Sequence, residues 1–96
     1  MIVHLRAIMD VASALGGKEH VLDLPGNTDL RGLLELLIGK YGEPLAALLF
    51  TEGSQMELLP HMRIYINGRS PLFLQGLDTV LHEEDDVMIM PQLSGG

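Results

Sequence analysis

The middle of the chain contains one helix-length segment with a single apolar stripe, and this stripe limits the folds that are open to the chain. The apolar residues recur at the i, i+3, i+4, i+7 spacing of one buried helix face: Leu30, Leu33, Leu34, Leu37, Ile38 and Tyr41. We expect the helix to begin at Thr28, whose hydroxyl can cap an unpaired amide, and to end between Gly39 and Gly42. Because a helix with one apolar stripe covers one face of one layer, the stripe predicts a single sheet packed beneath it.

Alternating apolar and polar residues on both sides of the helix predict the strands of that sheet. The first strand places alternate residues on opposite faces: Val3, Leu5 and Ala7 on one, and Ile2, His4 and Arg6 on the other. We expect further strands at 19–24, 62–67 and 87–90, and a brief extended segment at 72–74. Pro91 should stop the last strand, because proline lacks the N–H that a strand ladder uses.

Two short helical segments complete the predicted elements. Asp10 can cap a turn that ends at Gly16 and Gly17, and Pro44 can open a second short helix after the long one. The predicted order is therefore strand, strand, long helix, short helix and two or three further strands. This order is typical of an α+β domain.

The first and last strands are both rich in apolar residues, so we expect them to be central neighbours in a mixed sheet. If they run parallel, the chain beyond the last strand leaves from one end of the sheet. This is the β-grasp (ubiquitin-like) arrangement, with four to five strands covered by one long helix. We expect it to span residues 1–91, with residues 92–96 forming an extended, flexible C-terminal tail.

Composition narrows the classes of function. The chain has 96 residues, which suits one domain, and it contains no cysteine, which excludes a disulfide framework and thiolate metal sites. Its net charge of −7, with six basic residues, argues against nucleic acid as a partner. The acidic surface suits a partner with a basic surface, or it maintains solubility alone.

We find no membrane-spanning run and no secretory signal, and therefore expect a cytoplasmic protein. The four histidines lack metal-site spacing, so we expect no metal site.

The sequence closes on Ser94, Gly95 and Gly96. Because glycine has no Cβ, a Gly-Gly end can enter a channel too narrow for other dipeptides. Most chain ends are simply frayed, so the glycines by themselves leave both interpretations open. They become informative when a compact domain ends directly before them.

Several segments of the second half, taken in order, resemble the MoaD/ThiS family of sulfur carriers. They are residues 63–69 (RIYINGR), residues 74–79 (LQGLDT), the pair Asp86-Val87 and the terminal residues 94–96. The likeness is greatest to the small subunit of molybdopterin synthase and to MoaD-like proteins of archaea and bacteria. Two features depart from the family pattern. The acidic turn 82–86 lacks the glycine that is common there, and the segment 90–94 (MPQLS) lacks a Pro-Pro or similar pair.

The resemblance implies a chemistry that partner enzymes carry out on Gly96. An adenylating enzyme of the MoeB/ThiF type would use ATP and Mg²⁺ to convert the terminal carboxylate to an acyl-adenylate, and a sulfur donor would then leave a thiocarboxylate. In the molybdopterin branch, a MoaE-like large subunit would deliver this sulfur to a cyclic pyranopterin precursor. The carrier would bind no cofactor itself and would need no thiol, since the sulfur is held on a carboxyl carbon.

Two groups of residues are expected to contact the partners. Gly95, Ser94 and Leu93 would line the partner's channel next to Gly96. If Val87 and Ile89 face the helix, then Met88 and Met90 lie on the outer face of the sheet, together with Ile2 and Tyr65. Methionines adapt to more than one partner, so an apolar patch there would suit docking. The alternative is that the chain's own loops cover these side chains.

Other functions remain open at this level. The same activated glycine could be joined to a lysine of another protein, which would make the chain a ubiquitin-like modifier. The sulfur could instead serve thiamine synthesis or another pathway. A third possibility is a β-grasp binding module whose terminal glycines are incidental. The sequence shows no catalytic Ser/His/Asp order and no phosphate-binding loop, so we expect no catalysis by the chain alone.

Overall fold

A computed structural model of the chain describes residues 1–52, 57–71 and 74–92. The elements follow the order β1 (Ile2–Ala7), α1 (Met9–Leu15), β2 (Glu19–Asp23), α2 (Leu30–Tyr41), α3 (Glu43–Leu49), β3 (Met62–Ile66), the 3₁₀ helix η2 (Gly76–Asp78) and β4 (Asp85–Pro91). Of the predicted extended segment at 72–74, only Leu74 is described, and it lies in a turn. The remainder of that segment lies outside the described residues.

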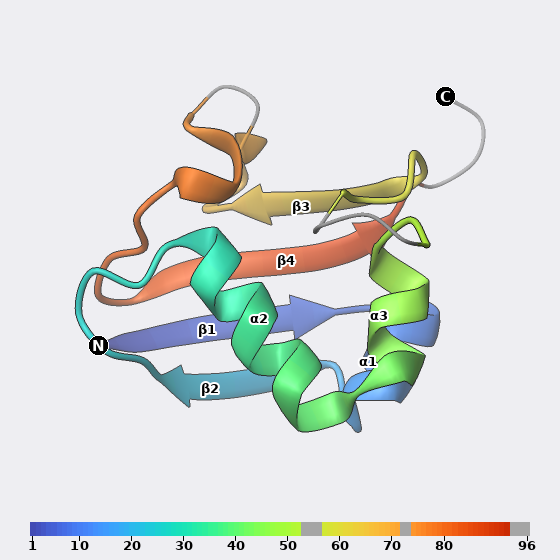
Figure 1. Cartoon of the computed structure of the whole chain (residues 1–96). Coiled ribbons are helices and arrows are strands. Elements are labelled where there is room, and N and C mark those ends of the chain that lie inside the picture. Colours follow the sequence, from blue (N-terminus) through green and yellow to red (C-terminus); the bar gives the residue numbers. More distant parts are fainter. Residues whose placement is uncertain (53–56, 72–73, 93–96) are drawn as a thin grey trace.

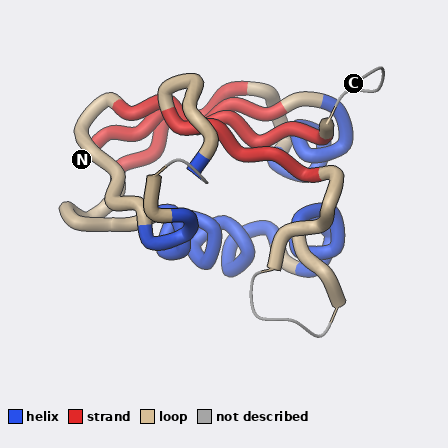
Figure 2. Tube along the Cα trace, turned by 90° about the horizontal axis from the view of Figure 1, so that it is seen from above, coloured by secondary structure: helices blue, strands red, loops and turns tan. Residues whose placement is uncertain are grey.

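The four strands form one mixed sheet in the order β2-β1-β4-β3. The central strands β1 and β4 run parallel, whereas β2 and β3 pair antiparallel with them. Figure 1 shows α2 lying across one face of the sheet, and Figure 2 shows the sheet and α2 as two layers. The predicted single sheet, its parallel central pair and its covering helix are therefore confirmed.

The core lies between α2 and the sheet, where the apolar stripe predicted it. Four leucines of the stripe are at most 1% exposed: Leu30, Leu33, Leu34 and Leu37. Ile38 and Tyr41 are half-buried and pack against the same cluster. From the sheet, the alternating residues of β1 and β4 meet this stripe, with Val3, Leu5, Val87 and Ile89 buried.

The start of α2 differs from the prediction. Its N-cap is Asp29, whose Oδ1 accepts the N–H of Gly32 at 2.8 Å, while the Thr28 hydroxyl donates to the carbonyl oxygen of Pro25 at 2.6 Å. A Cβ on Gly32 would approach Thr28 Cγ2 to 3.2 Å and Asp29 Oδ1 to 3.3 Å. The glycine near the helix start is therefore explained by the close approach of the residues that form the cap.

Two other predicted boundaries are corrected, and one is confirmed. Asp10 does not cap α1, because the N-cap is Ile8 and no side chain bonds there; Asp10 lies in the first turn. The predicted end of α2 between Gly39 and Gly42 is confirmed, since Tyr41 is the last helical residue and Gly42 is the C-cap, where φ is 77° and the N–H donates to the Ile38 carbonyl oxygen. Pro91 does not stop the last strand before it, since β4 extends through Pro91 opposite Met62.

The acidic turn before β4 adopts the geometry that the missing glycine would favour. Glu84 has a φ of 69°, in the left-handed region that costs an L-residue roughly 1–2 kcal/mol. Contacts with β1 hold the turn in place. The Glu84 N–H donates to the Ile2 carbonyl oxygen at 2.7 Å, and Glu84 Oε2 lies 2.7 Å from His4 Nε2. Contacts with β1 thus stabilise the turn, although glutamate at position 84 does not favour this backbone conformation.

Asp85 links this acidic turn to the turn after β3. Its side chain is 12% exposed, and its two oxygens accept from Asn67 Nδ2 at 2.9 Å and from the His82 N–H at 2.8 Å. We expect Asp85→Ala to lower the free energy of unfolding by about 1–3 kcal/mol, because both donors lose their partner. Asp85→Asn keeps an acceptor, so its free energy of unfolding should fall by less. Urea denaturation of both variants measures the difference, and an unchanged midpoint for Asp85→Ala would contradict this role.

Candidate functional site

The parallel pairing of β1 and β4 determines where the chain leaves the sheet. Both strands finish at the same end, and Figure 1 shows α1 and α3 at that end, away from the N-terminus. The tail residues predicted to react or to enter a partner's channel lie outside the described residues: Leu93, Ser94, Gly95 and Gly96. The candidate site is therefore described up to Gln92, and the roles of the four residues beyond it stay predictions.

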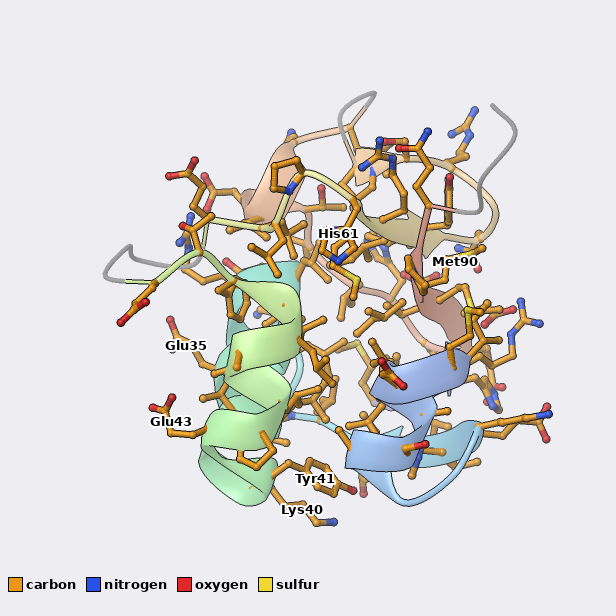
Figure 3. All side chains as sticks on the ribbon, turned by 90° about the vertical axis from the view of Figure 1, so that its right-hand side faces the viewer. Glu35, Lys40, Tyr41, Glu43, His61 and Met90 are labelled. Atoms are coloured by element: carbon orange, nitrogen blue, oxygen red, sulfur yellow. The ribbon has the colours of Figure 1, made fainter. Side chains whose placement is uncertain are left out.

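Met88 and Met90 lie on the face of the sheet that points away from α2, as alternation predicts. Their neighbours Val87 and Ile89 are fully buried, whereas both methionines are half-buried. The register places Met88 between Arg6 of β1 and Tyr65 of β3. Figure 3, viewed from the end where the tail leaves, shows Met90 at β4, away from α2 and α3. The geometry is that of a partly exposed apolar patch, and its use for docking stays a prediction.

Two charged pairs lie on the outer face of the sheet and separate Ile2 from the methionines. Arg6 binds Asp86 with Nε···Oδ1 at 2.9 Å and Nη2···Oδ2 at 2.8 Å, and this contact raises the pKa of Arg6 above its ordinary value. His4 lies beside Glu84 one pleat further along β1. Ile2 shares the outer face with the methionines, but His4 and Arg6 separate it from Met88 along β1. The apolar patch therefore gathers near the end of the sheet where the tail leaves.

Gln92 and the turn 60–63 form a hydrogen-bonded unit that we call the tail root. The Gln92 N–H donates to the His61 carbonyl oxygen at 2.5 Å, and Arg63 Nη2 donates to Gln92 Oε1 at 2.5 Å. The same guanidinium donates from Nη1 to the carbonyl oxygens of Pro60 at 2.6 Å and Met62 at 2.9 Å. Gln92, which the sequence assigned to the tail, is thus bonded to the domain through both its backbone and its side chain.

Sequence reasoning missed the connection between Arg63 and Gln92. Alternation places Arg63 on the outer face, on the same side as Tyr65, but it does not say which residue of β4 lies opposite. The register pairs Arg63 with Met90, which brings its side chain close to Gln92 two residues further on. A prediction of this contact would have required the strand register in addition to the local pattern.

The described residues contain no group of three or more His, Cys, Asp or Glu side chains placed to hold a metal ion. Across the same residues, no helix has the length and apolar character needed to cross a membrane. The candidate site consists of the outer-face methionines of β4 and the tail root that follows this strand.

The mixed sheet with a parallel central pair, covered by one long helix, defines a ubiquitin-like β-grasp protein. The solution structure of small archaeal modifier protein 1 from Methanosarcina acetivorans is similar to the whole domain, with a TM-score of 0.77 and 27% identity over 99% of this chain and 96% of that one. Urm1 from Trypanosoma brucei has the same fold, with a TM-score of 0.76.

Sequence comparison gives the family. The ThiS family profile matches residues 8–96, and the chain belongs to this family of ubiquitin-like sulfur carriers. A protein of Archaeoglobus fulgidus named "Putative sulfur carrier protein" is 36% identical over 64 residues, which cover 67% of this chain and 69% of that protein. Small archaeal modifier protein 3 of Haloferax volcanii is 28% identical over 96 residues, which cover the full length of both chains.

Proposed function

We propose that this protein is a cytoplasmic sulfur carrier in which the carboxylate of Gly96 is adenylated and then converted to a thiocarboxylate. The observation that carries the proposal is that the family match extends through residue 96, the second of the two terminal glycines. The sheet supports it, because the described chain ends directly after β4 at Gln92, which is hydrogen-bonded to the domain and leaves only four residues up to Gly96. An adenylating enzyme of the MoeB/ThiF type, with ATP and Mg²⁺, is the first partner.

The chemistry explains why partners are needed. A terminal carboxylate has an ordinary pKa near 3.5, so it is ionised at neutral pH and is a poor acyl donor. Attack of this carboxylate on the α-phosphate of ATP releases pyrophosphate and creates an activated acyl group. A sulfur nucleophile then forms the C–S bond as AMP leaves. The carrier supplies the acyl group, and the partner enzymes supply the catalytic groups.

For the destination of the sulfur, we propose molybdopterin synthesis with a MoaE-like large subunit. The support is the likeness of residues 63–69 and 74–79 to the small subunit of molybdopterin synthase. The test is reconstitution: thiocarboxylated protein is mixed with a MoaE-like subunit and the cyclic pyranopterin precursor, and dithiolene product is measured. Product that depends on the thiocarboxylate supports the assignment. A thiocarboxylated protein that leaves the precursor unchanged contradicts it.

A second candidate function is protein modification. It is favoured by the full-length similarity to a protein named small archaeal modifier protein 3. In this case the activated Gly96 is attacked by a lysine amine of another protein and forms an isopeptide bond. The test is digestion of cellular proteins with chymotrypsin, which can cleave after Leu93, and a search for lysines that carry a Ser-Gly-Gly remnant; trypsin is unsuitable because Arg69 is the last basic residue of the chain. Remnants that disappear when the gene is deleted support the modifier, and their absence from the parent strain contradicts it.

The outer-face methionines should contribute to docking on the adenylating enzyme. We expect Met88→Ser to raise the KM for the carrier in ATP–pyrophosphate exchange by roughly fivefold, because burying the exposed part of a methionine contributes about 1 kcal/mol. Val21→Ser is the matched control, since Val21 is 68% exposed on the same face but lies on edge strand β2. Equal KM values for the two variants would contradict a docking role for Met88.

A further inference from the structure

The tail root sets the starting point from which any partner must reach Gly96. Four residues follow Gln92, and four residues span at most roughly 14 Å when fully extended. Within so short a reach, the position of Gln92 largely determines where the terminal carboxylate can lie. The contacts that hold Gln92 therefore bear directly on the proposed reaction.

We propose that Arg63 is a positioning residue for adenylation, acting through its hydrogen bond to Gln92. The inference rests on the proposed function, because it concerns the delivery of Gly96 to the adenylating enzyme. Arg63 does not reach the reacting carboxylate. It connects Gln92 to the turn that precedes β3, so that the chain is already ordered up to residue 92 before the partner binds.

When the tail root is ordered before the partner binds, the entropic cost of docking is lower. Fixing the backbone of one residue carries a cost that corresponds to roughly a tenfold factor in an equilibrium constant. When Arg63 is lost, Gln92 keeps only the bond from its N–H to the His61 carbonyl oxygen. The partner must then order the root as well as the four residues beyond it. We therefore expect the effect in KM rather than in kcat.

Arginine is suited to this role by the shape of its side chain. Its planar fork carries several donors in fixed directions, and here three carbonyl-type oxygens accept from it. A lysine would keep the charge but could not reproduce this geometry. The KM of Arg63→Lys should therefore be closer to that of Arg63→Ala than to that of the parent protein. This result would show that the effect depends on hydrogen-bond geometry and not on charge alone.

The first experiment examines the contact itself and does not depend on any partner. Amide hydrogen exchange, followed by NMR, is measured for Gln92 in the parent protein, Arg63→Ala and Gln92→Ala. We expect the residue 92 amide to exchange faster in both variants, with the rest of β4 unchanged. Arg69→Ala is the control, since it removes the same charge beyond the other end of β3. Unchanged exchange in Arg63→Ala would overturn the proposed contact.

The second experiment measures KM and kcat for the same variants in ATP–pyrophosphate exchange with the organism's adenylating enzyme. Arg63→Ala should raise KM roughly tenfold and leave kcat unchanged, while Arg69→Ala leaves both unchanged. The pair Arg63→Gln with Gln92→Arg restores the hydrogen-bonded link with its ends exchanged and should recover part of the loss. A pair that restores slow exchange of the residue 92 amide but leaves KM as high as in Arg63→Ala would overturn the positioning role.

The outcomes separate this inference from the proposed function. If the parent protein supports no exchange, the proposed function fails, and the positioning role fails with it. If the parent supports exchange and Arg63→Ala has the same KM, only the positioning role fails. If Arg63→Ala does not fold, Gln92→Ala serves as the test, because it removes the same hydrogen bond from an exposed residue and should show the same rise in KM.

Discussion

Removal of Gly96 should abolish adenylation by the partner enzyme, with the ATP–pyrophosphate exchange rate falling by more than roughly 10²-fold. Truncation moves the terminal carboxylate back by one residue, and displacement of a reacting group by even about 1 Å can cost a factor of this size. The variant should fold like the parent protein, because the core and the sheet end before this residue.

Val21→Ser provides the control for this truncation. It alters an exposed residue of edge strand β2 and keeps the terminal carboxylate at its original distance from Gln92, so its exchange rate should stay close to that of the parent. A truncated protein that is adenylated as fast as the parent would show that the reacting group lies elsewhere. In that case the assignment to Gly96 would be wrong.

Leu34→Ala should lower the free energy of unfolding by about 2–5 kcal/mol. Leu34 is fully buried on the stripe of α2, so truncation removes apolar contacts and leaves a cavity between the helix and the sheet. For a domain of this length, 1 kcal/mol corresponds to roughly 4–8 °C in Tm, so we expect a loss of about 8–40 °C. Thermal unfolding followed by circular dichroism measures it.

Leu36→Ala is the control on the same helix. Leu36 is 44% exposed, and alanine has a high helix propensity, so the change in unfolding free energy should stay within about 0.5 kcal/mol. Similar losses for the two variants would mean that α2 does not bury the stripe that the structure places against the sheet.

The fold could be predicted from the sequence because its main signals are local and repeated. The leucine stripe of α2 and the alternation in β1 and β4 each appear several times, so one unusual residue does not obscure them. The details at the ends of elements depend on single residues. Thr28 and Asp29 are both good caps and stand next to each other, and only the three-dimensional arrangement shows that Asp29 bonds to Gly32.

The same distinction between local patterns and three-dimensional arrangement applies to the candidate site. Alternation alone placed Met88 and Met90 on the outer face, because it depends only on the period of a strand. The bond between Arg63 and Gln92 depends on how β3 and β4 align, which no local pattern specifies. The ion pair of Arg6 with Asp86 likewise joins residues 80 positions apart. Contacts of this kind become visible only when the register is known.

The mass of the C-terminal peptide, measured on protein isolated from its own cells, shows whether Gly96 carries sulfur. We expect a peptide that ends at Gly96, part of which is heavier by the difference between one sulfur and one oxygen atom. That fraction should disappear in cells that lack the adenylating enzyme. A native C-terminus at any other residue, or a peptide without sulfur in cells that actively make the sulfurated product, would contradict the account.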